Sequence, residues 1–463
     1  MITIQAGRPA ADSAANAAGE QSHPLRWSLN AELHARPFMV VEAPARVLHI
    51  ALLEPADGSP TGPELLAEFC RCLGVAPPVI DHAHLTLDLG TLRLKWEQHT
   101  EFTTFTLLLP GPFDHPFDNA LLQAVPMSWW KRLQGRVLAA VQVAIGKGAP
   151  PDALPGGPPG GGSGGVPGAP DEAAGPRYFT GIPVAGSRVL GGGARIWSDF
   201  RIGPDGFSRF LLWDTALREQ QAGRLIQRIL EIETYSMMAL LALPMARRSV
   251  AEVAAAEART GELTQRMLDN PHGEVEHGLL EDLTQLAAGV EGMIAGSSYR
   301  FNATLAYYAI VEARIAELRE DRIEGTPTFG EFMERRLAPA MQFCRSIARQ
   351  QADLSQRIMR ATQLLRTRVD VALERQNRDL LRSMDKRTQM QLRLQETVEG
   401  LSVIAISYYL ASLLGHFAEW VSGSLFGLDL HHVTGALVLP VLALVWFGAR
   451  RMRRMLHGAM AAE

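Results

Sequence analysis

The sequence predicts an α/β domain joined to a long α-helical stalk, which runs into a transmembrane hairpin of two helices. Three observations predict this order. Apolar and polar residues alternate in short runs between residues 46 and 110, with the period of two that is typical of β-strands. No proline lies between Pro339 and Pro440, so one helix could fill most of that stretch. Two uncharged apolar segments lie near the C-terminus, and such segments are typical of membrane spans.

Length and composition are consistent with several folded units in a reducing compartment. The chain has 463 residues, which at roughly 150 residues per domain suggests about three units. Its formal net charge is −4 and 20% of its residues are charged, an average that conceals the local apolar segments. Three cysteines are too few for a disulfide framework. Residues 1–24 lack the apolar core of a signal peptide, so we expect a disordered tail.

The α/β domain is expected over residues 25–146, and its sheet is expected to continue over residues 178–214. The strand-like runs are RVLHIALLE, LTLDLG, LRLKWEQ and FTTFTLLL. PELLAEFCRCLGV and MSWWKRLQGRVLAAVQVAIG are expected to be helices. Residues 147–177 are rich in proline and glycine and are interpreted as a linker or insertion. After them, the sequence GPDG at residues 203–206 predicts a β-hairpin.

Only helices are expected from residue 215 onward. The helical region covers residues 215–328, with separate helices predicted over residues 216–243, 250–267, 277–293 and 298–321. A basic stalk helix follows over residues 329–397, and a helix from residue 340 to 414 would be roughly 110 Å long. An imperfect apolar stripe along it indicates that the helix needs partners; its members are Leu354, Ile358, Leu365, Val369, Leu373, Leu380 and Met384.

The transmembrane hairpin is expected to consist of residues 398–420 and 433–449, with an outer loop over residues 421–432. Lysine and arginine residues precede the first span and follow the second, in the tail over residues 450–463, and none lies in the loop. The positive-inside rule then places both termini in the cytoplasm, with the chain in the inner membrane. The alternative is a buried helical hairpin in a soluble core.

Three phrases carry a resemblance to a known family. They are LNAELHARPF at residues 29–38, LIQRILEIETYSMMALLALP at residues 225–244, and LLRTRVDVALERQNRDLLRSM, which runs into LQETVEGLSVIAISYY. Together they resemble the bacterial family of two-span membrane proteins known as domain of unknown function 3422. That family name implies no biochemical activity.

The layout as a whole is more distantly similar to the CorA-type metal ion transporter superfamily. A CorA-like architecture implies a homo-oligomer, pentameric in that superfamily, whose first span lines a pore. The signature Gly-Met-Asn of that superfamily follows its first span. Here the corresponding residues are Leu414-Gly415-His416-Phe417, so only the glycine matches, and magnesium selectivity is not carried over.

A small or polar face on the first span supplies candidate pore-lining residues. They recur at steps of three and four, and are Ser402, Ala405, Tyr409, Ser412 and His416. Polar groups inside a membrane tend to face a bundle interior or water, although small residues also simply let helices pack closely. The candidates for a pore mouth or outer loop are Glu399, Gly415, Glu419 and Asp429.

No motif for catalysis, metal binding or cofactor binding is indicated. The Gly-rich stretch at residues 156–165 lacks the Gly-Lys-Ser/Thr ending of a phosphate-binding loop. Residues 345–394 carry twelve basic residues against five acidic ones, which would repel divalent cations unless the arginines pair with acids or with anionic lipid head groups. We interpret this surface as a solvated or partner-binding face, and expect no nucleic-acid partner.

Two hypotheses of function follow. The first is a membrane-anchored oligomeric scaffold or structural protein of the bacterial inner membrane with a large cytosolic domain. The second is a CorA-like ion channel or transporter with an altered selectivity motif. An enzyme is not indicated.

Overall fold

The computed structural model falls into two compact units. It describes residues 23–33, 37–55, 58–80, 82–133, 135–148, 178–179, 184–218, 220–269, 276–422, 438–448 and 450–451. Unit 1 comprises Met1–Gln265 and Asp282–Arg360. Unit 2 comprises Arg266–Glu281 and Ala361–Glu463.

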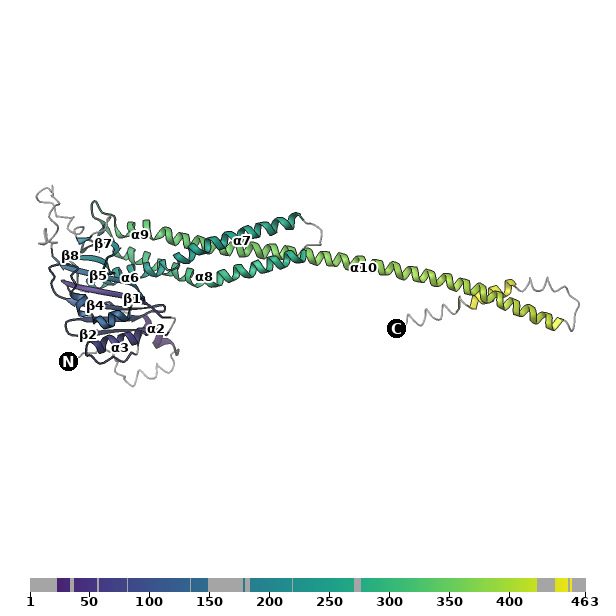
Figure 1. Cartoon of the computed structure of the whole chain (residues 1–463), viewed down its shortest axis with the longest axis horizontal. Helices are drawn as coiled ribbons and strands as arrows, with labels where there is room; N and C mark the ends of the chain where they lie inside the picture. The colour runs from purple at the N-terminus through teal and green to yellow at the C-terminus, as the bar shows by residue number, and fades with distance from the viewer. Residues whose placement is uncertain are drawn as a thin grey trace. The chain divides into compact units, whose positions relative to one another are not determined.

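Unit 1 is built on a mixed sheet, which the structure describes with nine strands (Figure 1). Their order across the sheet is β2-β3-β4-β1-β5-β8-β7-β6-β9. Neighbouring strands pair antiparallel except β5 and β8, which are parallel. The strands are β1 Ala45–Leu53, β2 His84–Asp88, β3 Arg93–Gln98, β4 Phe102–Pro110, β5 Val137–Lys147, β6 Ala185–Val189, β7 Ala194–Ile202, β8 Ser208–Asp214 and β9 Asp321–Arg322.

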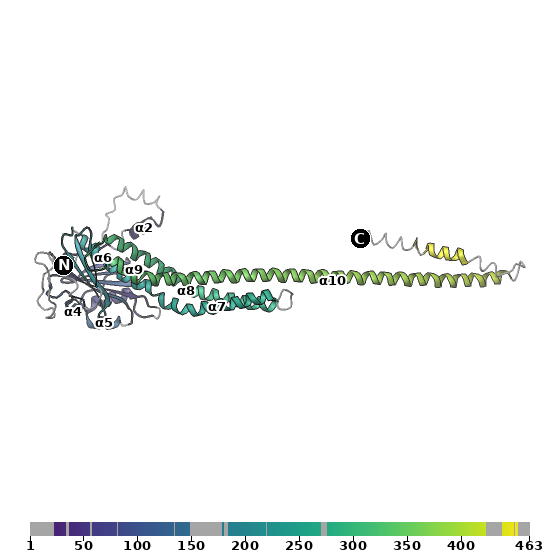
Figure 2. The same cartoon turned by 90° about the horizontal axis from the view of Figure 1, so that it is seen from above.

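Helices cover both faces of the sheet. The face lined by α3 (Gly62–Cys72), α4 (Ala120–Ala124) and α5 (Met127–Arg132) lies opposite the face lined by α6 (Gln221–Leu240) and α9 (Phe329–Arg336) (Figure 2).

Strand alternation decides which residues reach which helix layer. In β1, Leu48 and Ile50 join the cluster that contains Trp129 of α5. The intervening Val47 joins the cluster that contains Ile226 and Ile229 of α6. Each face of the sheet therefore has its own hydrophobic core.

The helix predicted from MSWWKRLQGRVLAAVQVAIG is wrong for most of its length. Only α5 is helical there, and β5 occupies the apolar run that follows. β5 lies between β1 and β8 and is buried over residues 139–146. A strand covered on both faces loses its alternation and reads as a continuous apolar run, which cannot be told from a buried helix by periodicity.

The hairpin predicted after the Pro/Gly-rich segment is present as β7 and β8. The two strands belong to the same sheet as β1 to β5, so the chain returns to that sheet after residues 149–177. The predicted linker itself lies almost entirely outside the described residues.

Three long helices follow α6. They are α7 (Leu243–Asp269), α8 (Glu276–Leu318) and α10 (Ala338–Ser422). Pro244 lies in the first turn of α7, where its missing N–H is tolerated. The prediction of separate helices over residues 277–293 and 298–321 is wrong, because α8 runs through both. Gly296 interrupts the pattern but costs only about 1 kcal/mol in a helix interior, and the neighbouring Ser297 side chain bonds to Gln351.

The single long helix predicted over residues 340–414 is confirmed as α10. In unit 2, Leu365 and Val369 of this helix are buried, and Arg368 Nη1 donates to the carbonyl oxygen of Met267 at 3.0 Å. A mixed sheet with long helices is thus the architecture of the described chain. A short helix, α2 (Arg26–Leu33), precedes the sheet.

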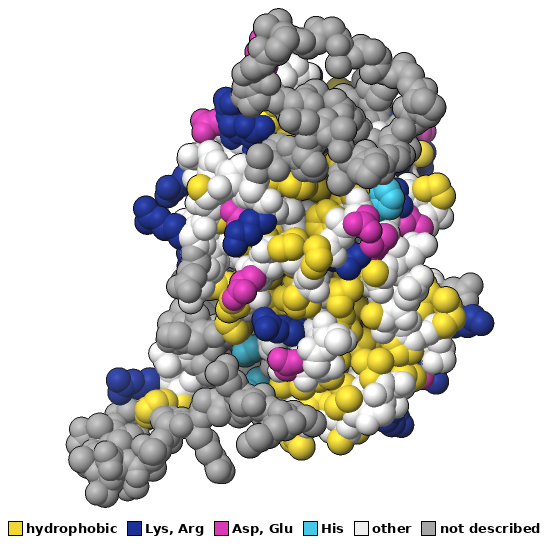
Figure 3. Space-filling view, turned by 90° about the vertical axis from the view of Figure 1, so that its left-hand side faces the viewer, with side chains coloured by type: hydrophobic (Ala, Val, Ile, Leu, Met, Phe, Trp, Pro, Cys, Tyr) yellow, Lys and Arg dark blue, Asp and Glu magenta, His cyan; other side chains and the backbone are white. Residues whose placement is uncertain are grey.

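One face of unit 1 is seen in the space-filling view. Lysine and arginine side chains are scattered there among acidic and apolar ones (Figure 3).

Candidate functional site

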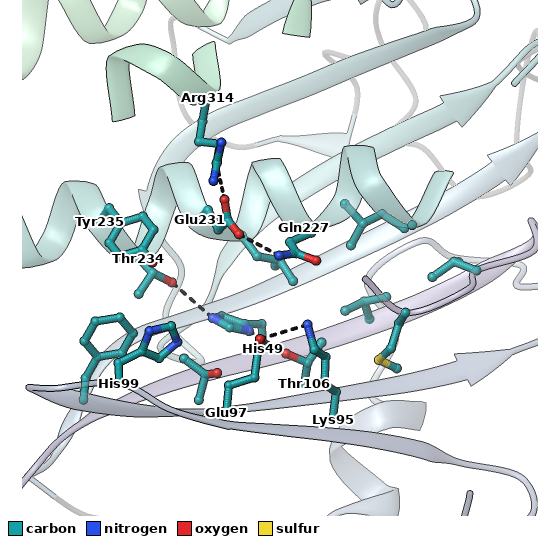
Figure 4. A pocket seen from close by; sticks show the side chains of 18 residues that line it. His49, Lys95, Glu97, His99, Thr106, Gln227, Glu231, Thr234, Tyr235 and Arg314 are labelled. Atoms are coloured by element: carbon teal, nitrogen blue, oxygen red, sulfur yellow. Dashed lines mark hydrogen bonds and ion pairs between the residues drawn. The ribbon is translucent and has the colours of Figure 1, made fainter. Parts of the chain in front are cut away.

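A cavity of about 280 Å³ lies in unit 1 between the sheet and α6. Three strands, β1, β3 and β4, form its floor, and α6 forms its roof (Figure 4). The segment before β1 closes it through Met39 and Val41, and α8 contributes Arg314.

The polar side chains of the floor come from alternate strand positions. In register, Lys95 of β3 pairs with Thr106 of β4, and Thr106 pairs with His49 of β1. Glu97 lies two residues after Lys95 and pairs with Thr104. Because residues i and i+2 share one face of a strand, these side chains form a polar patch toward α6. The residues between them, such as Leu94 and Trp96, belong to the core on the other face.

The roof is one stripe of α6. Its lining residues recur at helical spacing, and are Gly223, Ile226, Gln227, Leu230, Glu231, Thr234 and Tyr235. At Gly223 a Cβ atom would overlap the backbone carbonyl of Met39. Only glycine therefore lets α6 approach the closing segment this closely. Beside it, the Arg224 guanidinium lies 5.2 Å from the centre of the Phe38 ring.

His49 links the floor to the roof. Its Nδ1 lies 2.8 Å from Thr106 Oγ1 and its Nε2 lies 3.1 Å from Thr234 Oγ1. Burial, with smaller effects from the charges of His99 and Lys95, lowers the pKa of His49 from 6.5 to about 3. The imidazole is therefore neutral at physiological pH, and one of its nitrogens accepts a hydrogen bond while the other donates one.

Lys95 and Glu97 form a buried ion pair in the floor. Lys95 Nζ lies 3.0 Å from Glu97 Oε1, and both residues are buried. A buried ion pair is costly to desolvate and is not by itself a source of stability. Charged groups held inside a cavity are therefore candidates for a functional role.

A second ion pair holds the roof to α8. Arg314 Nε donates to Glu231, and Arg314 Nη1 donates to Glu317 at 2.7 Å. Gln227 Nε2 also donates to Glu231, at 2.7 Å. Both oxygens of the Glu231 carboxylate are therefore occupied by protein donors.

Thr104 carries a hydrogen-bonding group that is not used. It lines the cavity and is only 3% exposed, yet its Oγ1 has no hydrogen-bond partner among the described residues. An unpaired buried hydroxyl costs about 1–3 kcal/mol. Such a group indicates a place where a water molecule or a ligand completes the bonding.

The described lining of the cavity contains neither a cysteine nor a serine. Cys70, Cys72 and Cys344 do not line the cavity, and no lining serine lies beside His49. Among the described residues no group of three or more His, Cys, Asp or Glu side chains could hold a metal ion. The cavity offers a paired cation and anion, a free hydroxyl and an apolar end.

The five candidate pore-lining residues lie on one part of α10. Ser402, Ala405, Tyr409, Ser412 and His416 are all exposed. Ser402 Oγ donates to the carbonyl oxygen of Val398 at 2.8 Å, and His416 Nδ1 lies 2.7 Å from the carbonyl oxygen of Ser412. Both contacts are local to the helix.

A different small-residue face of the same segment is buried. Ser407 and Gly415 are buried, and Val403 and Ala411, which lie on the same line at steps of four, are half-buried. In the helical segment Val438–Gly448, Val441 is buried and Val445 is half-buried. Residues at steps of four lie along one line of a helix, so each helix hides one narrow stripe and exposes the rest.

The remaining sequence candidates are only partly described. Glu399 lies on α10. Gly415 is buried and belongs to the stripe described above. Glu419 lies within the last turns of α10, and its side chain is outside the described residues, as is all of Asp429.

Two helical stretches of the described chain are long and apolar enough to cross a membrane. They lie within Gln221–Asp269 and Phe329–Phe417. The first contains α6, the roof of the cavity.

The sequence contains a signal for the cavity residues, although no site is predicted from it. LRLKWEQ predicts an alternating strand, with no role for Lys95 and Glu97. His49 stands in the middle of the apolar run RVLHIALLE, on a face that an apolar helix such as α6 must cover. Polar residues on the covered face of a strand are the signal of a buried polar site.

Comparison with known proteins assigns a family but no function. The model of the family described as "Protein of unknown function (DUF3422)" matches residues 21–456. No curated protein and no solved structure matches the chain. The chain therefore belongs to the DUF3422 family.

Proposed function

We propose that this member of the DUF3422 family is a membrane-anchored oligomeric scaffold of the bacterial inner membrane, with unit 1 in the cytosol. The observation that carries the proposal is the exposure of the apolar end of α10. Only 11% of the most apolar window in Phe329–Phe417 is buried, and Leu413, for example, is 67% exposed. An apolar surface of this length is stable in lipid and unstable in water.

The flanking charges support a hairpin with both ends in the cytosol. Lys386, Arg387 and Arg393 precede the first apolar segment, and a basic tail follows the second. Arg450 lies 4.9 Å from the centre of the Trp446 ring. Tryptophan and arginine together are typical of the membrane–water interface.

The apolar stripe of α10 supports association with a second copy of the chain. Leu365 and Val369 are buried within unit 2. Leu373, Leu380 and Met384 continue the same stripe but are exposed. Because the stripe extends beyond its partner within the chain, parallel α10 helices from several copies would bury the remainder.

The anchor is tested by fractionation of the full-length protein. We expect the protein to sediment with membranes, to resist extraction by alkaline carbonate and to dissolve only in detergent. Full-length protein that stays in the supernatant after ultracentrifugation without detergent would exclude the anchor. Chemical cross-linking and mass measurement in detergent then give the number of copies, and a monomer would exclude the oligomer.

A CorA-like channel is the second candidate. The observation in its favour is that the face from Ser402 to His416 is polar or small and is not used by the buried stripe. In an oligomer of five copies this face would line the path of an ion. The test is ion flux into liposomes that contain the oligomer. Flux that changes in Ser402→Val and Tyr409→Phe but not in Leu413→Val supports the channel; no flux under any gradient with an intact oligomer excludes it.

A further inference from the structure

We infer that the cavity beneath α6 binds a small zwitterion with an apolar side chain, of the chemical class of the branched-chain α-amino acids. This inference does not depend on the membrane anchor, because every residue that carries it belongs to unit 1.

The charges of the wall favour a ligand without net charge. Lys95 is paired with Glu97, and Arg314 is paired with Glu231, so the two ion pairs cancel. His49 is neutral, and His99, whose ring stacks on Phe102, also lines the cavity. A simple anion or cation would bring an uncompensated charge into this desolvated space, which is strongly unfavourable.

The ion pair of the floor is open on its cavity side. An ammonium group has three N–H donors, and Glu97 is the one partner of Lys95 among the described residues. Only Oε1 of Glu97 is used by that contact. Two donors and one carboxylate oxygen are therefore left for a ligand, together with the unpaired Oγ1 of Thr104, which lies opposite Glu97 in register.

The spacing of this pair matches the head group of an α-amino acid. Lys95 Nζ and Glu97 Oε1 lie 3.0 Å apart. In an α-amino acid the ammonium nitrogen and the carboxylate are bonded to the same carbon, so they lie roughly 3 Å apart. The ligand can therefore align its carboxylate with Lys95 and its ammonium with Glu97, and each charge then meets its opposite.

Five aliphatic side chains form an apolar part of the cavity beside its polar groups. Met39, Val41, Val47, Ile226 and Leu230 line it, and they suit an aliphatic side chain. Its volume of about 280 Å³ lies just below the range of about 300–1,000 Å³ found for pockets of drug-sized ligands. A single amino acid fits this scale.

The test uses full-length protein in detergent and three matched probes. L-leucine carries both charges, 4-methylpentanoate lacks the ammonium group, and 3-methylbutylamine lacks the carboxylate. We expect L-leucine to raise the unfolding temperature of unit 1 and to bind by calorimetry, since a ligand of the folded state stabilises it. Each single-charge analogue is expected to bind at least about tenfold more weakly.

Three variants locate the binding. Lys95→Met/Glu97→Gln removes both charges together and should abolish the response to L-leucine, and Thr104→Val should weaken it. The control is Arg46→Met/Asp118→Asn, which removes the partly buried Arg46–Asp118 pair outside the cavity and should leave binding unchanged. If the double variant does not fold, Thr104→Val and the comparison of probes still decide.

Two results would overturn the inference. One is the absence of any response of the wild-type protein to L-leucine and L-valine at millimolar concentration. The other is 4-methylpentanoate or 3-methylbutylamine binding as tightly as L-leucine, which would show that the ion pair does not recognise a zwitterion.

Discussion

Two apolar helical stretches of this protein have similar mean hydropathies, 1.3 and 1.5, and different surroundings. Each is long and apolar enough to cross a membrane, but 56% of the window in Gln221–Asp269 is buried and only 11% of the window in Phe329–Phe417 is. The first lies on a sheet and roofs a polar cavity. The second has almost no protein around it. Hydropathy therefore identifies a helix that avoids water, and tertiary structure decides whether protein or lipid takes the place of water.

Replacing one apolar residue of each stretch by a charged one should give the largest difference between the two stretches. Leu225 of α6 is fully buried, so Leu225→Asp leaves a carboxylate without a partner in the core. We expect a loss of more than about 4 kcal/mol, enough to prevent unit 1 from folding. Limited proteolysis and circular dichroism of the full-length variant measure it.

The matched change in α10 is Leu413→Asp. Leu413 is exposed, so unit 1 should fold normally and resist protease as in the wild type. In the membrane, an aspartate near the helix centre costs about 3 kcal/mol, and we expect more protein to be released by alkaline carbonate. Unchanged extraction of Leu413→Asp would contradict the assignment of this stretch to lipid.

Breaking an ion pair in the cavity and breaking one on α10 should also change the free energy of unfolding by very different amounts. Lys95→Met leaves Glu97 buried and unpaired, and we expect a loss of about 3 kcal/mol in the free energy of unfolding. Lys95→Met/Glu97→Leu should recover most of that loss. The exposed pair of Arg378 and Glu374, at 2.9 Å, serves as the control, because Glu374→Gln should change stability by no more than about 0.5 kcal/mol.

Urea denaturation in detergent, followed by tryptophan fluorescence, measures these differences. The buried Trp96 lies on the strand that carries Lys95, so it reports on the unit that changes. Equal losses for Lys95→Met and Glu374→Gln would show that the floor of the cavity is open to water.

Glycines give a third comparison. A methyl group at Gly223 would overlap the carbonyl of Met39, and at Gly400 it would meet nothing within 4 Å. Gly223→Ala is therefore expected to cost about 1–3 kcal/mol. Gly400→Ala should stabilise the helix by up to about 1 kcal/mol. Thermal unfolding of both variants tests this. An unchanged unfolding temperature in Gly223→Ala would show that the segment around Met39 does not pack against α6.

The sequence predicts the elements of this protein better than the places where they meet. The long helix α10 is predictable because no proline or glycine interrupts it over sixty residues, and the β7–β8 hairpin because its turn sequence has few alternatives. β5 is not predictable from periodicity, because both of its faces are covered. The continuity of α8 past Gly296 depends on packing that a local pattern does not contain.

The candidate site shows the same limit. Lys95, Thr106 and His49 lie in one row across three strands. In the sequence, however, His49 is more than forty residues from both Lys95 and Thr106. Their meeting depends on strand order, which no local pattern gives. The candidate pore-lining residues show the opposite limit. Their spacing is evident in the sequence, but partners supplied by other copies of the chain are outside the structure of one chain.

The pH dependence of stability gives the smallest and most specific prediction. His49 has a pKa of about 3 in the folded protein against 6.5 for an exposed imidazole. Between these values the unfolded chain binds a proton at His49 that the folded chain does not bind, so the unfolding free energy falls as the pH is lowered from 6.5. The slope from this residue is roughly 1 kcal/mol per pH unit, and it is absent above pH 6.5.

His49→Gln should remove this slope, because an amide can replace the bonds to Thr106 and Thr234 without titrating. Other buried acids act on the wild type and the variant alike. Burial raises the pKa of Glu233, which gives a slope of opposite sign above pH 4.5, and the lowered pKa of Glu101 matters only below about pH 4.5. The difference between wild type and variant in urea denaturation at pH 7, 6 and 5 therefore isolates His49. Parallel pH profiles would mean that the imidazole is solvated and that the cavity beneath α6 is open to water.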